Sequence, residues 1–266
     1  MLLNALLTFL LVVSFSINAK PWRLCHEDKE YPPYLTNSVQ NTQPEGLVID
    51  VLSGAAKHAN TPIAFVARPW KRCKQGVKNG IYDGLFVMLK TPKRTEQFAY
   101  PTNEQHYLSK VDYVILYKKG SPLHRAESNG KLFNEQGQFN FNYYKRIQEF
   151  GLQAPTGYVL HQFLKQHNVA ANDNYDLDLG INQVANGRLD GYVVEKRAGL
   201  KRVEALNKQG IVISSQGVLK HTYWYVPFNR DFYNKNKDDV ARFWHHMQLS
   251  RKQPDWQPFQ EKYHVL

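Results

Sequence analysis

Two stretches of the chain carry nearly the same sequence: residues 77–87 read Val-Lys-Asn-Gly-Ile-Tyr-Asp-Gly-Leu-Phe-Val, and residues 184–194 read Val-Ala-Asn-Gly-Arg-Leu-Asp-Gly-Tyr-Val-Val. Six of the eleven positions are identical, at an offset of 107 residues. A second pair, residues 46–52 and 157–164, is similar at an offset of 111. Asn-Gly and Asp-Gly are common turn pairs, so one match alone is weak. Two matches in the same order at nearly the same offset indicate two similar lobes.

The apolar pattern of the first half alternates between strand and helix spacing. Residues 23–27, 62–67 and 81–89 are predicted strands, because they are short apolar runs that end at turn residues. Residues 47–56 and 70–78 have apolar positions at helical spacing. This alternation predicts parallel strands joined by right-handed crossovers. The predicted fold class is therefore α/β, with two similar lobes, each a mainly parallel sheet flanked by helices.

Two further runs have the pattern of strands that connect the lobes. They are residues 107–118 and 221–226, and a predicted helix over residues 238–249 follows the second. The chain is thus expected to leave the first lobe near residue 110 and to return near residue 222. Two connecting strands form a hinge about which the lobes can close. The predicted domains are lobe one at residues 20–110, lobe two at residues 111–221, and the return to lobe one at residues 222–266.

The composition is that of a folded, basic and exported protein. Hydrophobic residues make up 42% and aromatic residues 13% of the 266 positions, which excludes a disordered chain. Residues 1–19 are free of charged side chains and end at Ala19, as a secretory signal peptide does. They also lack an early Lys or Arg, and a single membrane anchor is the alternative. The net charge of +11 is interpreted as a solvated basic surface rather than as a nucleic-acid site.

The two cysteines, Cys25 and Cys73, are 48 positions apart. In an oxidising compartment such a pair is expected to form a disulfide, and two buried thiols are the alternative. Residues 25–28 read Cys-His-Glu-Asp, which are all metal-ligand types. Neighbouring residues of a strand point to opposite faces and do not converge on one ion, so no metal site is predicted there.

Short motifs along the chain carry a family resemblance. They are Glu27-Asp-Lys-Glu-Tyr31-Pro-Pro-Tyr34, Gly46-Leu-Val-Ile-Asp50, Pro69-Trp70-Lys-Arg72-Cys73, Gly80-Ile-Tyr-Asp83-Gly84, Thr91-Pro-Lys-Arg94 with Phe98, and Gly187-Arg-Leu-Asp190-Gly. Over nearly all of the mature chain, the sequence resembles the bacterial extracellular solute-binding proteins of polar-amino-acid ABC importers. This resemblance implies a periplasmic binding protein of type II. It would be a monomer without a cofactor that binds a small-molecule solute and contacts an inner-membrane ABC permease or a sensor.

The resemblance also implies where a ligand binds. Arg94 is expected to pair with the ligand's carboxylate through two N–H groups, and Thr91 to cap the short helix that carries it. Across the cleft, Thr156 is expected to begin a helix whose amides bind the same carboxylate, and Glu195 to pair with a ligand ammonium. The expected aromatic wall consists of Tyr31, Tyr34 and Trp70. Without the resemblance, a surface arginine, an unliganded cap and core aromatic residues explain the same positions.

One departure from the family pattern concerns the residues before Arg94. Amino-acid binders usually carry serines there, whereas residues 86–89 of this chain read Phe-Val-Met-Leu. Backbone groups remain available at these positions, but hydroxyl groups do not. The ligand is therefore expected to be less like a free α-amino acid, for example a carboxylate with an aromatic or apolar body.

Solute capture by hinge closure is the function that these residues favour. A periplasmic sensor or adaptor is the first alternative. A second is an enzyme like the cyclohexadienyl dehydratases of this fold, with Glu195 as general acid after burial had raised its pKa. No nucleophile-base pair supports the enzyme, and no catalytic residue is predicted.

Overall fold

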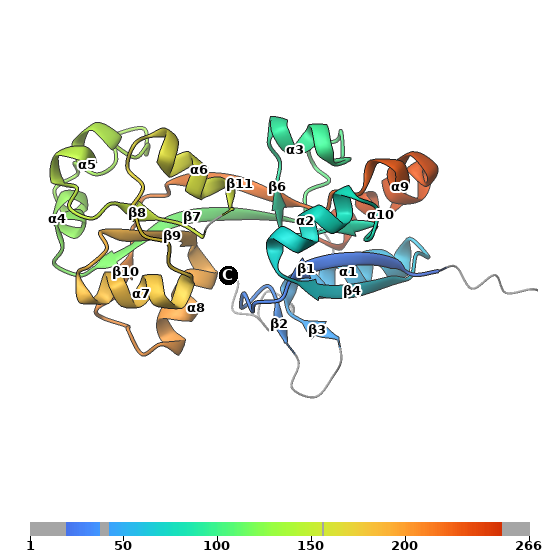
Figure 1. The fold of residues 1–266 in the computed structure, drawn as a ribbon, viewed down its shortest axis with the longest axis horizontal. Helices are drawn as coiled ribbons and strands as arrows, with labels where there is room; N and C mark the ends of the chain where they lie inside the picture. Colours follow the sequence, from blue (N-terminus) through green and yellow to red (C-terminus); the bar gives the residue numbers. More distant parts are fainter. Residues whose placement is uncertain (1–19, 38–42, 156, 252–266) are drawn as a thin grey trace, which may run out of the picture.

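The computed structural model describes residues 20–37, 43–155 and 157–251. The predicted signal segment, residues 1–19, and the predicted ligand residue Thr156 lie outside the described residues. The described chain folds into two α/β lobes that lie at opposite ends of a pair of long strands (Figure 1). Within it, no helix has both the length and the apolar character needed to cross a bilayer.

The first lobe is built on a parallel sheet in the order β4-β1-β5. The strands are β1 (Trp22–Glu27), β4 (Ile63–Arg68) and β5 (Gly84–Leu85). Helices α1 (Leu47–His58) and α2 (Trp70–Lys78) follow β1 and β4, as the sequence predicts. The lobe also contains β2 (Thr36–Asn37), β3 (Pro44–Glu45), α3 (Pro92–Gln97), α9 (Arg230–Lys235) and α10 (Lys237–Ser250).

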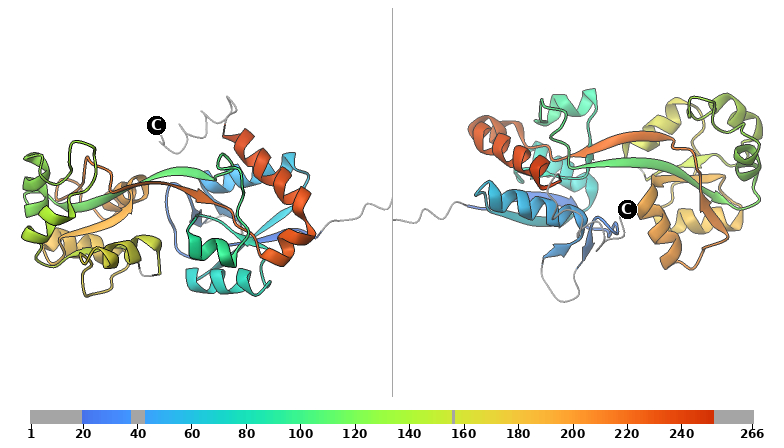
Figure 2. Two further views of the ribbon diagram at one scale, coloured as in Figure 1. Left: turned by 90° about the horizontal axis from the view of Figure 1, so that it is seen from above. Right: turned by 180° about the vertical axis from the view of Figure 1, so that it is seen from behind.

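Helix α1 is amphipathic because its apolar residues recur at helical spacing. All six residues of the predicted face are buried: Leu47, Val48, Val51, Leu52, Ala55 and Ala56. Helix α10 packs along α1 (Figure 2). A helix that follows the second connecting strand therefore contributes to the core of the first lobe.

The second lobe contains the remaining described helices and three shorter strands in the sheet of the connecting strand β7. Its elements are α4 (Pro122–Ser128), α5 (Phe141–Ile147), β8 (Leu152–Gln153), α6 (Val159–Gln166), α7 (Leu177–Asn186), β9 (Gly191–Glu195), α8 (Lys196–Ala205) and β10 (Val212–Ser214). Strands β8 and β9 are parallel. Strand β7 runs antiparallel to β9 and β10, because it enters this sheet from the first lobe.

Two antiparallel strands connect the lobes: β7 (Ser109–Lys118) and β11 (Lys220–Tyr225). At the first-lobe end, β11 also pairs with β6 (Met88–Leu89). The six-stranded sheet thus runs from the first lobe into the second, and both strands span the space between the lobes (Figures 1 and 2).

Residues 81–89 do not form the single strand that the sequence predicts. Strand β5 pairs with β1 in one sheet, whereas β6 pairs with β11 in the other. Between them, Val87 has a φ of 60°, a left-handed conformation that β-branched residues rarely adopt. The chain changes sheets at this residue, which is why the predicted strand is divided.

The repeated motif has the same structural role in both lobes. Helices α2 and α7 both end at the Asn-Gly pairs. In the first lobe, Asp83 Oδ2 accepts a hydrogen bond from the backbone N–H of Arg23 at 2.7 Å. In the second, Asp190 Oδ2 accepts one from the backbone N–H of Gly151 at 2.9 Å. Asp83 thereby joins its turn to strand β1, and Asp190 joins its turn to the residue before strand β8.

The disulfide between Cys25 and Cys73 is present, which confirms the predicted pairing. Their Cα atoms are 5.5 Å apart, and the bond joins β1 to α2 in a buried cluster with Val77, Leu85 and Met88. The C-terminal end of β1 and the N-terminal end of α2 both point toward the second lobe (Figure 1).

We expect loss of this disulfide to destabilise the protein. Closing a loop with a sequence separation of 48 lowers the entropy of the unfolded chain. On that basis, the double variant Cys25→Ala/Cys73→Ala should lose about 4 kcal/mol of unfolding free energy. Urea denaturation followed by circular dichroism measures the difference. The wild type in excess reductant is the control and should shift the same way, and an unchanged midpoint in the double variant would contradict the expectation.

Candidate functional site

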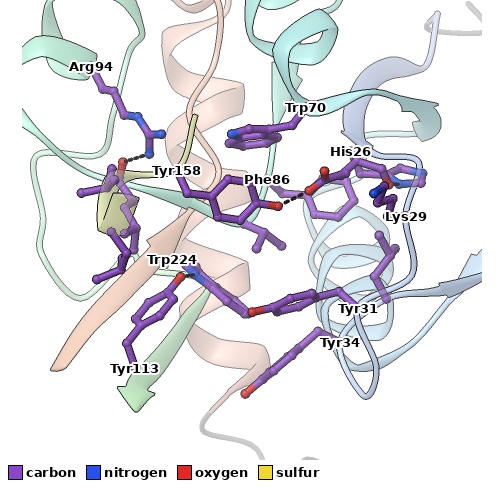
Figure 3. Close-up of a pocket in the computed structure, with 16 residues that line it drawn as sticks. His26, Lys29, Tyr31, Tyr34, Trp70, Phe86, Arg94, Tyr113, Tyr158 and Trp224 are labelled. Atoms are coloured by element: carbon purple, nitrogen blue, oxygen red, sulfur yellow. Dashed lines mark hydrogen bonds between the residues drawn. The ribbon is translucent and has the colours of Figure 1, made fainter. Parts of the chain in front are cut away.

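A pocket of about 660 Å3, including its open mouth, lies between the lobes (Figure 3). The first lobe contributes the C-terminal end of β1, the loop after it, the start of α2, residues 86–89 and Arg94. The connecting strands contribute Tyr113 and Trp224, and the start of α6 in the second lobe contributes Tyr158. The volume is in the range of small-molecule sites, and ligands of α/β folds bind beyond the carboxyl ends of strands.

Arg94 is a cation on the pocket wall, in the first turn of α3. Thr91 caps this helix by accepting the backbone N–H of Arg94 at 3.3 Å, with Pro92 at the first position, as the sequence predicts. The Arg94 Nη1 donates to the carbonyl oxygen of Leu89 at 3.0 Å. Burial lowers the pKa of the guanidinium. Within the described part of the chain no carboxylate pairs with Arg94, so its other N–H groups are available to an anion.

Glu27 is the carboxylate on the pocket wall, at the end of β1. The hydroxyl of Tyr158, from the second lobe, donates a hydrogen bond to it (Figure 3). Burial raises the pKa of Glu27, and the hydrogen bond from Tyr158 opposes that shift. Because these residues belong to different lobes, the contact joins the lobes across the cleft.

Two further polar contacts span the cleft beside this one. Lys29 Nζ lies 3.4 Å from Asp176 Oδ2, and Lys74 Nζ donates to the carbonyl oxygen of Gly157 at 3.3 Å. The rings of Trp70 and Tyr158 also lie near each other across the cleft, with centroids 6.0 Å apart and planes tilted by 55°. The structure therefore has the lobes in contact around the pocket.

Aromatic side chains form much of the pocket wall. Trp70 covers one side, and Phe86 lies opposite (Figure 3). At the base, the Trp224 indole N–H donates to the Tyr113 hydroxyl at 3.1 Å. The predicted residues Tyr31 and Tyr34 line the same pocket, and the Tyr34 ring packs edge-on against Trp224 with a centroid distance of 4.8 Å.

Glu195 is not among the residues that line this pocket. It is 2% exposed and begins α8, where its carboxylate accepts the backbone N–H of Ala198 at 2.9 Å. It also shares hydrogen bonds with Tyr34 and with backbone near Arg197. Burial raises its pKa.

Helix α6 begins later than predicted. Its first residue is Val159 and its N-cap is Tyr158, whereas Thr156, the predicted cap, lies outside the described residues. Val159 and Leu160 of this helix line the pocket together with Tyr158.

Sequence reasoning missed several residues of the pocket. His26 and Glu27 end a predicted strand, and the rule that ligands bind beyond strand ends is a signal that points to them. Tyr158 lies two residues beyond Thr156, and the sequence pattern predicted the start of the helix at Thr156 instead. Tyr113 and Trp224 read as ordinary strand residues, because only the pairing of β7 with β11 brings them together.

Residues 25–264 match the bacterial extracellular solute-binding proteins, family 3. The chain belongs to this family. Comparison of this solute-binding protein with curated proteins finds no match. Among solved structures, it is similar to a histidine kinase sensor domain that resembles periplasmic binding proteins, with 15% identity, a TM-score of 0.70 and coverage of 92% of this chain and 96% of that one.

Two other similar structures are those of amino-acid-binding proteins. One is an ancestral amino-acid-binding protein described as a precursor of cyclohexadienyl dehydratase, with 16% identity, a TM-score of 0.67 and coverage of 91% of this chain and 94% of that one. The other is an arginine-specific periplasmic binding protein from Salmonella typhimurium, with 15% identity, a TM-score of 0.65 and coverage of 92% and 99%. At these identities the likeness shows the two-lobed fold of type II periplasmic binding proteins.

We expect Glu27→Gln to stabilise the ligand-free solute-binding protein near neutral pH. A carboxyl with a raised pKa favours folding at low pH, and this contribution is lost as the pH rises through the folded-state pKa. The amide removes the buried charge, so the variant should melt higher than the wild type at about pH 8, with a smaller difference at about pH 4. Thermal melts across this range measure the effect.

Glu96→Gln is the matched control for that series, because Glu96 is exposed on α3. Its melting temperature should equal that of the wild type across the same pH range. If the melting temperature of Glu27→Gln exceeds that of the wild type by more as the pH falls, the assigned direction of the Glu27 pKa shift is contradicted.

Proposed function

We propose that this protein captures a small carboxylate-bearing solute, an amino acid or a derivative of one, in the cleft between its lobes. Arg94 carries the proposal, because it is a half-buried cation on the pocket wall that pairs with no carboxylate of the described residues. A buried guanidinium gains most from a bidentate anion, which restores the interactions that it loses on leaving water. The solute's carboxylate is the partner that fits this position.

The body of the solute would lie against the aromatic wall. Tyr31, Tyr34 and Trp70 supply large apolar faces, and burial of an apolar or aromatic group there contributes roughly 25 cal/mol per Å2 removed from water. Thr91 would act through the helix that it caps, since its hydroxyl orients the first turn that carries Arg94.

Closure about the two connecting strands completes the site. Strands β7 and β11 are the paired connections on which one lobe can rotate against the other, and Tyr158 and its neighbours would then approach the solute from the second lobe. A solute that contacts both lobes binds the closed form better than the open one, and so shifts the population toward it.

The closed form would be presented to an inner-membrane ABC permease from the periplasm. The extracellular solute-binding family and the likeness to a Salmonella periplasmic binding protein support this assignment. The likeness to a histidine kinase sensor domain supports a second candidate, a periplasmic adaptor that reports the solute to a membrane sensor. In both cases the solute is bound and released without chemical conversion, which mass spectrometry of the recovered ligand would check.

We expect Arg94→Ala to weaken the binding of carboxylate solutes. A screen of amino acids and small carboxylates by thermal shift identifies a solute, and calorimetry then measures its affinity. Loss of the charged pair should weaken binding by about 2–4 kcal/mol, or roughly 30-fold to 1000-fold. Arg72→Ala is the matched control, because Arg72 is exposed on α2 and does not line the pocket. Equal affinities of the wild type and Arg94→Ala would remove Arg94 from the site.

A further inference from the structure

The charges around the pocket restrict the kind of carboxylate that it can take. Resting on the proposed function, we propose that the solute is an aromatic monocarboxylate without an α-ammonium group, whose carboxylate accepts hydrogen bonds from Arg94 and from the indole N–H of Trp70. Four observations lead to this ligand class.

The first observation is an excess of one positive charge. Lys29 is already paired with Asp176 across the cleft. Of the charged side chains that line the pocket, this leaves Arg94 and Glu27, and Lys74 lies near both. Each of the two cations has a pKa lowered by burial, and Arg94 lowers that of Lys74 further. One monoanion balances these charges, whereas a zwitterionic amino acid leaves the excess in place.

The second observation is that an ammonium would have to share its acceptors with donors that are already present. Glu27 Oε2 accepts the hydroxyl of Tyr158, so this carboxylate would be shared with Tyr158. Glu195 lies outside the pocket lining and accepts the first amides of α8. The carbonyl oxygen of Leu89 accepts both Arg94 Nη1 and the Tyr100 hydroxyl, each at 3.0 Å. Asp28 is exposed and does not line the pocket.

The third observation is a buried donor without an acceptor. The indole nitrogen of Trp70 is buried and has no hydrogen-bond partner within the described residues, although Trp70 lines the pocket. Figure 3 shows the nitrogen-bearing edge of this ring turned toward the side on which Arg94 lies. Buried N–H groups are nearly always paired in proteins. A carboxylate has two oxygens and about four acceptor positions, enough for Arg94 and Trp70 together.

The fourth observation is the apolar wall beside these donors. Phe86, Val87 and Leu89 line the pocket at the positions where the sequence lacks serines, and the rings of Tyr158 and Trp70 line it as well. Aromatic rings prefer to pack edge-on or offset against one another, so a planar ring fits this wall better than a flexible polar chain.

The test uses ligands that differ by one group. 3-Phenylpropionate is L-phenylalanine without its α-ammonium, and 3-phenylpropan-1-ol lacks the carboxylate as well. Calorimetry with the mature wild-type protein should show 3-phenylpropionate binding at least about tenfold more tightly than either of the other two. Its aliphatic counterpart, 4-methylpentanoate, should also bind more weakly than 3-phenylpropionate.

Trp70→Phe tests the indole donor, because it keeps a ring and removes the N–H. We expect this variant to lose about tenfold in affinity for 3-phenylpropionate, with a thermal melt reporting that it is folded. Unchanged affinity in the folded variant would overturn the role of Trp70.

The remaining outcomes separate this inference from the proposed function. If L-phenylalanine or another α-amino acid binds more tightly than its counterpart without the ammonium, the ligand class is wrong and carboxylate capture stands. If 4-methylpentanoate equals or exceeds 3-phenylpropionate, the aromatic assignment is wrong. If no carboxylate binds, amino acids included, the inference and the proposed function both fail.

Discussion

The antiparallel pairing of β7 with β11 is the constraint on which the rest of the molecule depends. The chain crosses between the lobes on these strands, and their hydrogen bonds place the two crossings side by side. Trp224, on β11, pairs with Ser109 of β7 on one side and with Leu89 of β6 on the other. The carbonyl oxygen of Leu89 in turn accepts a hydrogen bond from Arg94. The position of the pocket cation thus follows from the strand pairing of the hinge.

Burial shifts the pKa values of the charged groups in the cleft so that the neutral form of each group is favoured. The pKa values of Arg94 and Lys74 are lowered and that of Glu27 is raised, with desolvation the largest cause in all three. An unliganded cleft with its lobes in contact therefore carries charged groups that have lost water without gaining full partners. A bound anion would stabilise the cations, and this links solute binding to lobe closure through electrostatics as well as through contact area.

Much of the fold follows from short-range patterns. The helical spacing of residues 47–56, the cap at Thr91 and the repeated Asn-Gly and Asp-Gly turns each act over a few residues, and the structure contains all of them. The disulfide of Cys25 with Cys73 was predictable from the number of cysteines and the exported character of the chain. Where the prediction failed, the cause was pairing at long range: residues 81–89 divide at Val87 because two different sheets take up the two halves.

The sequence by itself determined the two-lobed α/β fold, the hinge strands and the position of Arg94 in the first turn of its helix, because local spacing and repetition encode them. Only the tertiary structure decided which side chains share the cleft. Glu27 and Tyr158 are 131 positions apart and meet only when the lobes meet, whereas Glu195, a good candidate by position, is directed to the start of its own helix. Side chains from separate lobes are brought together by packing, and this packing cannot be predicted from a local sequence pattern.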